Sequence, residues 1–591
     1  MESTSTKRRR RTLRSSDAKR RRKSMISGSY LPDECWECVF KFLKDNNRCL
    51  KSLSIVSKQL LSIVSKQLLS ITNRLRFSLT VYDPTLPFLP TLLRRFTNLT
   101  SLDLSCFNGK LNKLLCQISR FPLKLTSLNL SNKCIIPTIG LQTFSKKITT
   151  LTSLTCSKMQ YINSSDLVLI SHCFPLLEVL DLNYPTQCYH GAVELSLSKL
   201  RKINLSYHSY IDDEFILHLF ESCKLLEEAI MLPCVDITFV GIANALRERP
   251  TLRSVSFSNT FGRVDWWRRQ STYITSQFIS SFDLLSLNIS DELLSSIAYQ
   301  CLPLTRLVLQ DCTGYSYSGI LSLLSKCQHF QHLDLQNAVF LKDDHVVEMS
   351  SFLVDLESIN LTHCSMLTES AFFVLLKNCP SLSEIKMEHT CIGKKSLESS
   401  KSLMDFVACP QLKYLRLAHN PWLFDEYITM LASIFSNLQL LDLSNCCRIS
   451  EEGIVQFLRI CCNIRHLNLS QCSTVKLEMN FEVPKLEVLN LSQTIVDDEA
   501  LYMISKSCCG LLKLSLKNCN DITKKGVKHV VENCTQLRKI NFYGCQKVHA
   551  DFVSSMVSSR PSLRKITAPP ARNGFGKRKI NYFLRRGCLV L

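Results

Sequence analysis

Large apolar residues recur along most of the chain in the pattern Leu-x-x-Leu-x-Leu. With conservative exchanges allowed, the first position of this pattern falls at 19 places between Leu99 and Leu563, and twelve of the eighteen spacings are identical. The clearest copies begin at Leu99, Leu356, Leu438, Ile464 and Leu511. A fixed period of about 26 residues indicates an array of repeated structural units.

Each unit joins an alternating apolar stretch to a segment with helical spacing. The Leu-x-Leu part predicts a short strand, and residues 497–508 predict a helix with Asp497 as its N-cap. One such unit cannot bury its apolar face alone, whereas stacked copies bury a continuous core and place all strands on one concave side. We therefore predict an α/β fold in which residues 96–570 form a solenoid of about 19 repeats, shaped as a horseshoe or superhelix.

The chain has 29 cysteines, and many keep a fixed place in the repeat. Eight lie three positions before a leading residue, as Cys461 does, and seven lie eight positions after one, as Cys446 does. Residues 1–25 lack the apolar segment of a secretory signal, so we expect a reducing compartment, in which disulfides are rare. We interpret these fifteen cysteines as small buried residues of the repeat.

This pattern resembles the cysteine-containing class of leucine-rich repeats found in plant-like proteins. The resemblance covers about residues 95–570. It implies that the strand side of the solenoid recognises another protein and that the repeats carry no catalysis of their own.

A second pattern occupies residues 29–75, ahead of a linker or cap at 76–95. It opens with Leu-Pro-Asp-Glu and continues at helical spacing. A helical module of about 40 residues is too small to bury a sizeable core, so its apolar faces are expected to be completed by a partner. The module resembles an F-box, which implies docking to a Skp-type adaptor and, through it, to a cullin; a cap for the solenoid is the alternative. The residues that would contact the adaptor are Leu31, Pro32, Cys35, Val39, Phe40, Leu43 and Val56.

Two features depart from the F-box pattern. Leu60 stands where the family usually has an aromatic residue, and the octapeptide SIVSKQLL occurs twice in tandem, at 54–61 and 62–69. Eight helical residues turn the chain by about 800°, which leaves the second apolar stripe about 80° out of phase with the first. We expect the first copy to pack in the F-box.

The net charge of +22 is concentrated at the two ends, since residues 1–25 and 572–586 together account for fifteen of these charges. The middle is nearly balanced, which argues against binding to nucleic acid. Residues 1–28 are expected to be a disordered tail, whose two basic clusters predict a bipartite nuclear import signal and a location in the nucleus, the cytoplasm or both. A merely solvated tail is the alternative. The clusters consist of Lys7, Arg8, Arg9, Arg10, Arg11, Lys19, Arg20, Arg21, Arg22 and Lys23.

Residues 571–591 are expected to be a second basic tail. The chain ends in Cys588-Leu589-Val590-Leu591, which fits the prenylation pattern for a geranylgeranyl group on Cys588. No apolar run reaches the length of roughly 18 residues that a membrane span needs. Membrane contact is therefore expected only if Cys588 is prenylated.

The unit beginning at Leu252 is the longest by this spacing, because the next leading position falls at Leu284. It contains Trp266, Trp267, Arg268 and Arg269, residue types that dominate binding energy at interfaces. These four are candidate substrate-binding residues, with burial in the core as the alternative. The concave strand residues are the broader candidate surface.

No cofactor, metal site or catalytic residue is predicted. Cys35 and Cys38 have the spacing of a metal-binding pair, but a second Cys or His pair is missing. The resemblance implies a non-catalytic substrate-recognition subunit of an SCF-type ubiquitin ligase, which recruits an unknown target protein for ubiquitination and proteasomal degradation. The alternatives are a protein-interaction scaffold outside any ligase and a small-molecule receptor of the same architecture.

Overall fold

The structure of the chain is a computed structural model. It describes residues 73–74, 76–185, 187–189, 197–208, 211–232, 252–258, 278–394, 409–569 and 576–590, with 234, 241 and 249. These residues form two compact units, which meet in the sequence between Gln187 and Cys188 and are treated separately below. The predicted adaptor contacts, the import clusters, the duplicated octapeptide and Trp266–Arg269 all lie outside the described residues.

The first unit is a parallel sheet covered by helices. Its strands pair in the order β1 (Ser78–Thr80), β2 (Ser101–Asp103), β3 (Ser127–Asn129), β4 (Ser153–Thr155) and β6 (Val179–Asp181). Its helices are η1 (Asp83–Phe88), α5 (Leu89–Arg95), α6 (Leu111–Ile118), α7 (Thr138–Ser145) and α8 (Ser164–Cys173), and it also contains the short strand β5 (Tyr161–Asn163). Strand β7 (Gln187–Tyr189) spans the boundary between the units.

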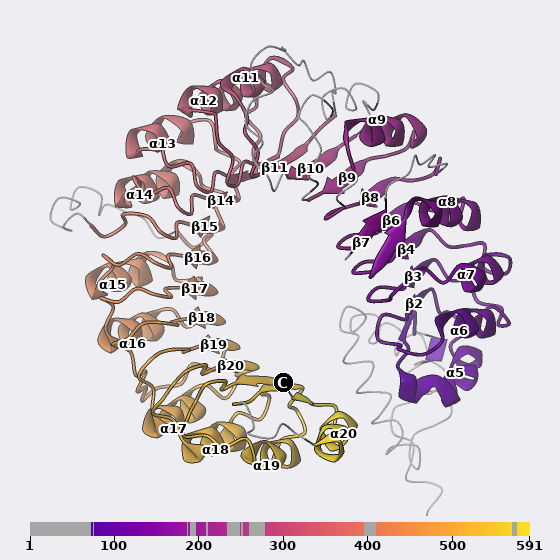
Figure 1. Ribbon diagram of the computed structural model, residues 1–591. Helices are drawn as coiled ribbons and strands as arrows, with labels where there is room; N and C mark the ends of the chain where they lie inside the picture. Colours follow the sequence, from indigo (N-terminus) through magenta and orange to yellow (C-terminus); the bar gives the residue numbers. More distant parts are fainter. Residues whose placement is uncertain are drawn as a thin grey trace, which may run out of the picture. The chain divides into compact units, whose positions relative to one another are not determined.

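The second unit repeats this arrangement, with the strands on its inner side and the helices on its outer side (Figure 1). The strands are β8 (Lys202–Asn204), β9 (Glu228–Met231), β10 (Ser254–Ser258), β11 (Ser281–Leu285), β12 (Arg306–Val308), β13 (His332–Asp334), β14 (Ser358–Asn360), β15 (Glu384–Lys386), β16 (Tyr414–Arg416), β17 (Leu440–Asp442), β18 (His466–Asn468), β19 (Val488–Asn490), β20 (Lys513–Ser515), β21 (Lys539–Asn541), β22 (Lys565–Thr567) and β23 (Leu589–Val590). The helices are α9 (Asp213–Ser222), α11 (Asp291–Tyr299), α12 (Tyr317–Lys326), α13 (Asp343–Ser350), α14 (Glu369–Asn378), α15 (Asp425–Ile434), α16 (Glu451–Ile460), α17 (Asp498–Ser507), α18 (Lys524–Asn533), α19 (Phe552–Ser559) and α20 (Lys577–Arg585).

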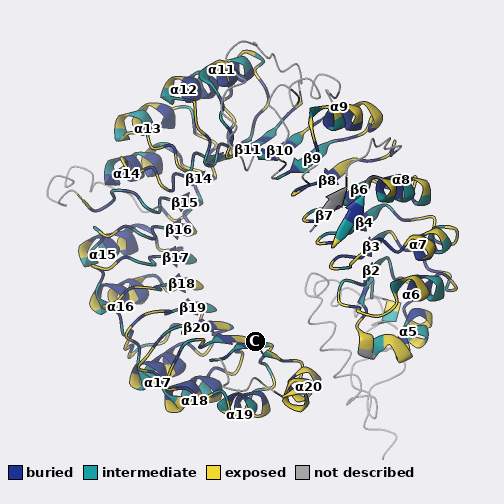
Figure 2. Ribbon diagram, in the orientation of Figure 1, coloured by how far each residue is buried: buried dark blue, intermediate teal, exposed yellow. Residues whose placement is uncertain are grey.

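The repeat pattern fixes the register of the sheet. Leu441 of β17, for example, lies opposite Leu415 of β16 and Leu467 of β18, and all three are buried. In Figure 2 buried residues recur along the strands and on the helices of successive repeats. The predicted α/β leucine-rich-repeat solenoid is confirmed.

Neighbouring helices are tied together by a carboxylate. Asp291, at the start of α11, accepts hydrogen bonds from the backbone N (2.7 Å) and Oγ (2.6 Å) of Ser316, the N-cap of α12. Asp343 and Thr368 repeat the contact between α13 and α14. At α12 a Cβ added at Gly319 would clash with Asp291 Oδ1, whereas α14 has Ala371 at the equivalent position. Each cap therefore also joins one repeat to the next.

The predicted role of Asp497 is confirmed, and fourteen of the fifteen repeat cysteines are buried as predicted, whereas Cys301 is exposed. Asp497 caps α17 by accepting a hydrogen bond of 3.0 Å from Ala500 N. Cys461 and Cys446 are fully buried, and burial raises the pKa of the Cys461 thiol to about 12. The Cys446 thiol also donates to the carbonyl of Leu417 in the preceding repeat, at 3.3 Å. The cysteine thus packs as a small residue and satisfies a backbone acceptor.

One predicted unit boundary is wrong. Spacing alone placed a leading position at Leu284, but Phe282 and Leu284 pair with Val255 and Phe257 of β10, so the unit begins at Ile279. The unit from Leu252 therefore ends just before Ile279 and is close to the regular length. The error arose because Leu284, Leu287 and Ile289 imitate the repeat pattern one strand-length later.

The C-terminal residues extend the solenoid. We expected a basic tail at 571–591, but residues 576–590 form α20 and β23, and Leu589 of β23 pairs with Lys565 of β22. Cys588 is buried, which raises its thiol pKa to about 11, so prenylation would require β23 to leave the sheet. Among the helices that the structure describes, none is both long and apolar enough to cross a bilayer.

Candidate recognition surfaces

On the face of β11 to β18 that points away from the helices, side chains of opposite charge pair with one another. Arg306 pairs with Asp283 at 3.0 Å, and Arg416 lies 3.9 Å from Asp442 and 4.0 Å from Glu384. Asn468 Nδ2 donates to Asp442 at 2.9 Å. Most charge on this part of the strand face is therefore neutralised within the protein.

The strands that follow carry uncompensated positive charge. Lys513, Lys539 and Lys565 occupy the same place on β20, β21 and β22 and lie in register. Arg538 and Arg564 each precede one of these lysines, and within the described part of the chain no carboxylate is paired with any of the five, which we call the basic row. Neighbouring strands lie about 4.8 Å apart, so these cations repel one another and favour an anionic partner.

The sequence contained a signal for the basic row. Lysine occupies the same position of three consecutive repeats, in LLKLSL, LRKINF and LRKITA. The net charge summed over the whole middle of the chain did not reveal this local excess of positive charge. Reading charge by repeat position would have found it.

A stack of imidazole rings lies in the turns that follow β14, β15 and β16. His363 and His389 have ring centroids 4.2 Å apart, and His389 and His419 have centroids 4.1 Å apart. All three have positive φ, between 53° and 63°. Burial and the two flanking rings lower the pKa of His389 below its usual value.

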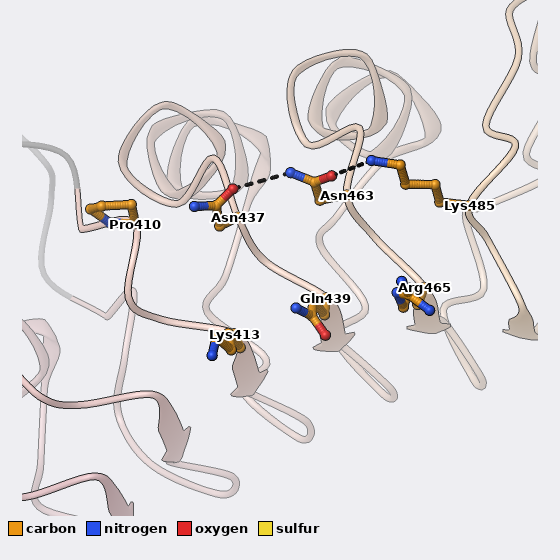
Figure 3. A pocket seen from close by; sticks show the side chains of 7 residues that line it. All are labelled: Pro410, Lys413, Asn437, Gln439, Asn463, Arg465 and Lys485. Atoms are coloured by element: carbon orange, nitrogen blue, oxygen red, sulfur yellow. Dashed lines mark hydrogen bonds between the residues drawn. The ribbon is translucent and has the colours of Figure 1, made fainter. Parts of the chain in front are cut away.

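A pocket of about 290 Å³ opens where the connections from α15 and α16 run into the strands (Figure 3). Asn463 Nδ2 donates to Asn437 Oδ1 at 3.1 Å, and Lys485 Nζ donates to Asn463 Oδ1 at 2.6 Å, which forms one linked row. A second row stands at the strand starts. Its members are Lys413, Gln439 and Arg465, and Pro410 completes the lining.

The structure places few of the predicted site residues. Cys588 is buried at the end of the second unit, whereas the predicted adaptor and substrate contacts fall outside the described residues. The broader candidate, the strand face, is present and carries the basic row. Within the described chain, no cluster of His, Cys, Asp or Glu could hold a metal ion.

Curated proteins that are similar to the chain include the following three. A transport inhibitor response 1-like protein of Oryza sativa subsp. japonica is 22% identical over 319 residues, covering 49% of this chain and 54% of that protein. F-box protein SKIP1 of Arabidopsis thaliana is 29% identical over 163 residues, covering 27% and 52%. DNA repair protein rhp7 of Schizosaccharomyces pombe is 24% identical over 285 residues, covering 43% and 46%. The chain spans about half the length of these relatives.

The resemblance to the F-box/leucine-rich-repeat proteins is confirmed. No protein-family model matches the chain. Among solved structures, the crystal structure of a TLR13–ssRNA13 complex is similar, with a TM-score of 0.43 and 17% identity over 75% of this chain and 62% of that one. The repeats make up the described part of this chain. The F-box predicted at 29–75 lies almost entirely outside the described residues and stays a prediction.

Proposed function

We propose that this chain is the substrate-recognition subunit of an SCF-type ubiquitin ligase. The observation that carries the proposal is the similarity to F-box protein SKIP1 and two further relatives, together with a solenoid that presents an unpaired basic row. The F-box would bind a Skp-type adaptor, and the adaptor would bind a cullin. The chain itself would do no chemistry, since holding a target beside a charged ubiquitin carrier raises the effective concentration of the target lysines.

The target in this proposal is a protein with an acidic segment. The basic row offers three lysines on adjacent strands and two arginines directly before two of those strands, whereas β11 to β18 neutralise most of their own charges. An acidic segment laid across β20 to β22 would relieve the repulsion among the lysines, and its attraction would weaken with salt. Ubiquitination would then lead to proteasomal degradation. The basic clusters at Lys7–Arg11 and Lys19–Lys23 would direct part of the protein to the nucleus.

The adaptor step is tested by co-purifying a Skp-type adaptor with the full-length chain. We expect capture by the wild type and loss of capture when Leu31→Ala and Pro32→Ala are combined. Lys539→Glu is the matched control, because it changes the target surface and should leave adaptor capture intact. Failure of the wild type to capture the adaptor would reject the ligase assignment in favour of an interaction scaffold.

The target step is tested by charge reversal on the strand face. Lys513→Glu, Lys539→Glu and Lys565→Glu together should abolish target binding without affecting adaptor capture. The control reverses the same number of charges on the helix side, at the exposed residues Lys524, Lys525 and Lys528 of α18. Equal loss of target in both triple variants would refute the basic row as the target site.

A further inference from the structure

The pocket beside β16, β17 and β18 is lined almost entirely by hydrogen-bond donors. Lys413, Arg465 and Lys485 supply positive charge, Asn437, Gln439 and Asn463 supply amides, and no carboxylate is among the described residues that line it. Within the described chain, the acid bonded to this cluster is Glu487, which pairs with Arg465 at 2.8 Å. One carboxylate against three cations leaves a surplus of about two positive charges at neutral pH.

The hydrogen bonds in the linked row determine which of its donors remain available. The Oδ1 of Asn437 accepts from Asn463, and the Oδ1 of Asn463 accepts from Lys485. The two amide oxygens are therefore occupied, which leaves Asn437 Nδ2 and two N–H bonds of Lys485 to donate. Lys413 and Gln439 face the same space from the strand starts (Figure 3).

This set of donors is confined to three successive repeats. At the place of Lys413, Gln439 and Arg465, the preceding repeat has Ser383 and the following repeat has Glu487. The Oγ of Ser383 donates a hydrogen bond of 3.1 Å to the carbonyl oxygen of Glu357. The pocket therefore ends on both sides and is a local site, separate from the basic row on β20 to β22.

We propose that this pocket binds a phosphate group. A phosphomonoester carries close to two negative charges at pH 7 and offers three acceptor oxygens, which match the surplus charge and the donors of the two rows. A volume of about 290 Å³ equals that of about ten water molecules in the liquid, which accommodates a phosphate together with the atoms that carry it. The phosphate would belong to a phosphorylated side chain of a partner protein or to a soluble phosphate ester. This binding does not require the adaptor or the ligase.

The test is calorimetric titration of the full-length chain with three probes: a phosphoserine peptide, the same peptide with aspartate in place of phosphoserine, and inorganic phosphate. We expect the phosphoserine peptide to bind at least tenfold more tightly than the aspartate peptide. Lys413→Gln with Lys485→Gln should weaken its binding by at least tenfold. Lys524→Gln with Lys525→Gln removes the same charge from α18 and should leave binding unchanged. Circular dichroism verifies that both double variants are folded.

Competition distinguishes the two sources of phosphate. Tight binding of the peptide with weak competition by inorganic phosphate supports a phosphorylated side chain, and equally tight binding of inorganic phosphate supports a soluble ester. Equal affinity for the aspartate peptide would overturn the proposal, because the pocket would then be a general anion surface. An unchanged affinity in the folded Lys413/Lys485 variant would overturn it as well. Adaptor capture is measured on the same samples, so failure of this site and failure of the ligase assignment are told apart.

Discussion

Asn420 is fully buried and takes the place that cysteine holds in many repeats, eight positions after the leading Leu412. Its Nδ2 donates to the carbonyls of Met387 (2.8 Å) and Leu417 (3.0 Å). Its Oδ1 accepts from Thr390 N (2.8 Å) and Thr390 Oγ1 (3.0 Å). The amide therefore joins two repeats across the connection from β15 to β16, which is longer than the regular repeat.

Replacing Asn420 by Ala should destabilise the protein by about 4 kcal/mol, at about 1 kcal/mol for each of the four hydrogen bonds. The Thr390 amide would be left buried without an acceptor, whereas the carbonyl of Leu417 keeps the thiol of Cys446 at 3.3 Å. Cys446→Ala, at the same repeat position, removes one thiol bond and should cost about 1–2 kcal/mol. Asn420→Cys should fall between the two.

Hydrogen–deuterium exchange of the Thr390 amide is the decisive assay, because a solenoid can open locally without unfolding throughout. A loss of about 4 kcal/mol corresponds to exchange faster by about three orders of magnitude. Urea denaturation supplies the global comparison. If the exchange rate of the Thr390 amide increases equally in Asn420→Ala and Cys446→Ala, the proposed role of Asn420 in joining the two repeats is refuted.

The remaining predictions concern pH, packing and the duplicated segment. Burial raises the pKa of Cys223 and Cys364 from 9.0 to about 12. As the pH rises above 9, the unfolded state therefore loses thiol protons that the folded state keeps. The free energy of unfolding, which is constant below pH 9 in this respect, should fall by about 1.4 kcal/mol per thiol at pH 10. A urea midpoint that does not change between pH 8 and pH 10 would contradict this. Gly319→Ala should lower the free energy of unfolding, measured by urea denaturation, by about 1–2 kcal/mol, because the new Cβ would clash with Asp291. The loss is expected despite the higher helix propensity of alanine. An unchanged stability would show that the Asp291 carboxylate moves freely. Deleting residues 62–69 should leave adaptor co-purification intact or improved, and abolished capture would show that the second copy belongs to the F-box.

The sequence predicted most of the fold because one physical requirement, a set of buried leucines at a nearly constant interval, recurs in each repeat. That rule failed where Leu284 and Ile289 reproduced the spacing outside the true register. It also left out α20 and β23, whose basic composition resembles that of a solvated tail. The repeat pattern could not predict the phosphate pocket, because Lys413, Gln439 and Arg465 belong to three separate repeats. These residues come together only when the repeats stack.

The paired cysteines give the solenoid a built-in set of chemical reporters. In Cys446–Cys447, Cys461–Cys462 and Cys508–Cys509 the first thiol is buried and the second is exposed. Because the thiolate is the reactive form and burial raises the thiol pKa, an alkylating reagent should modify the second member of each pair in the native protein and reach the first only when its repeat opens. Mass spectrometry of partially alkylated protein would then record the order in which the repeats unravel, without any introduced label.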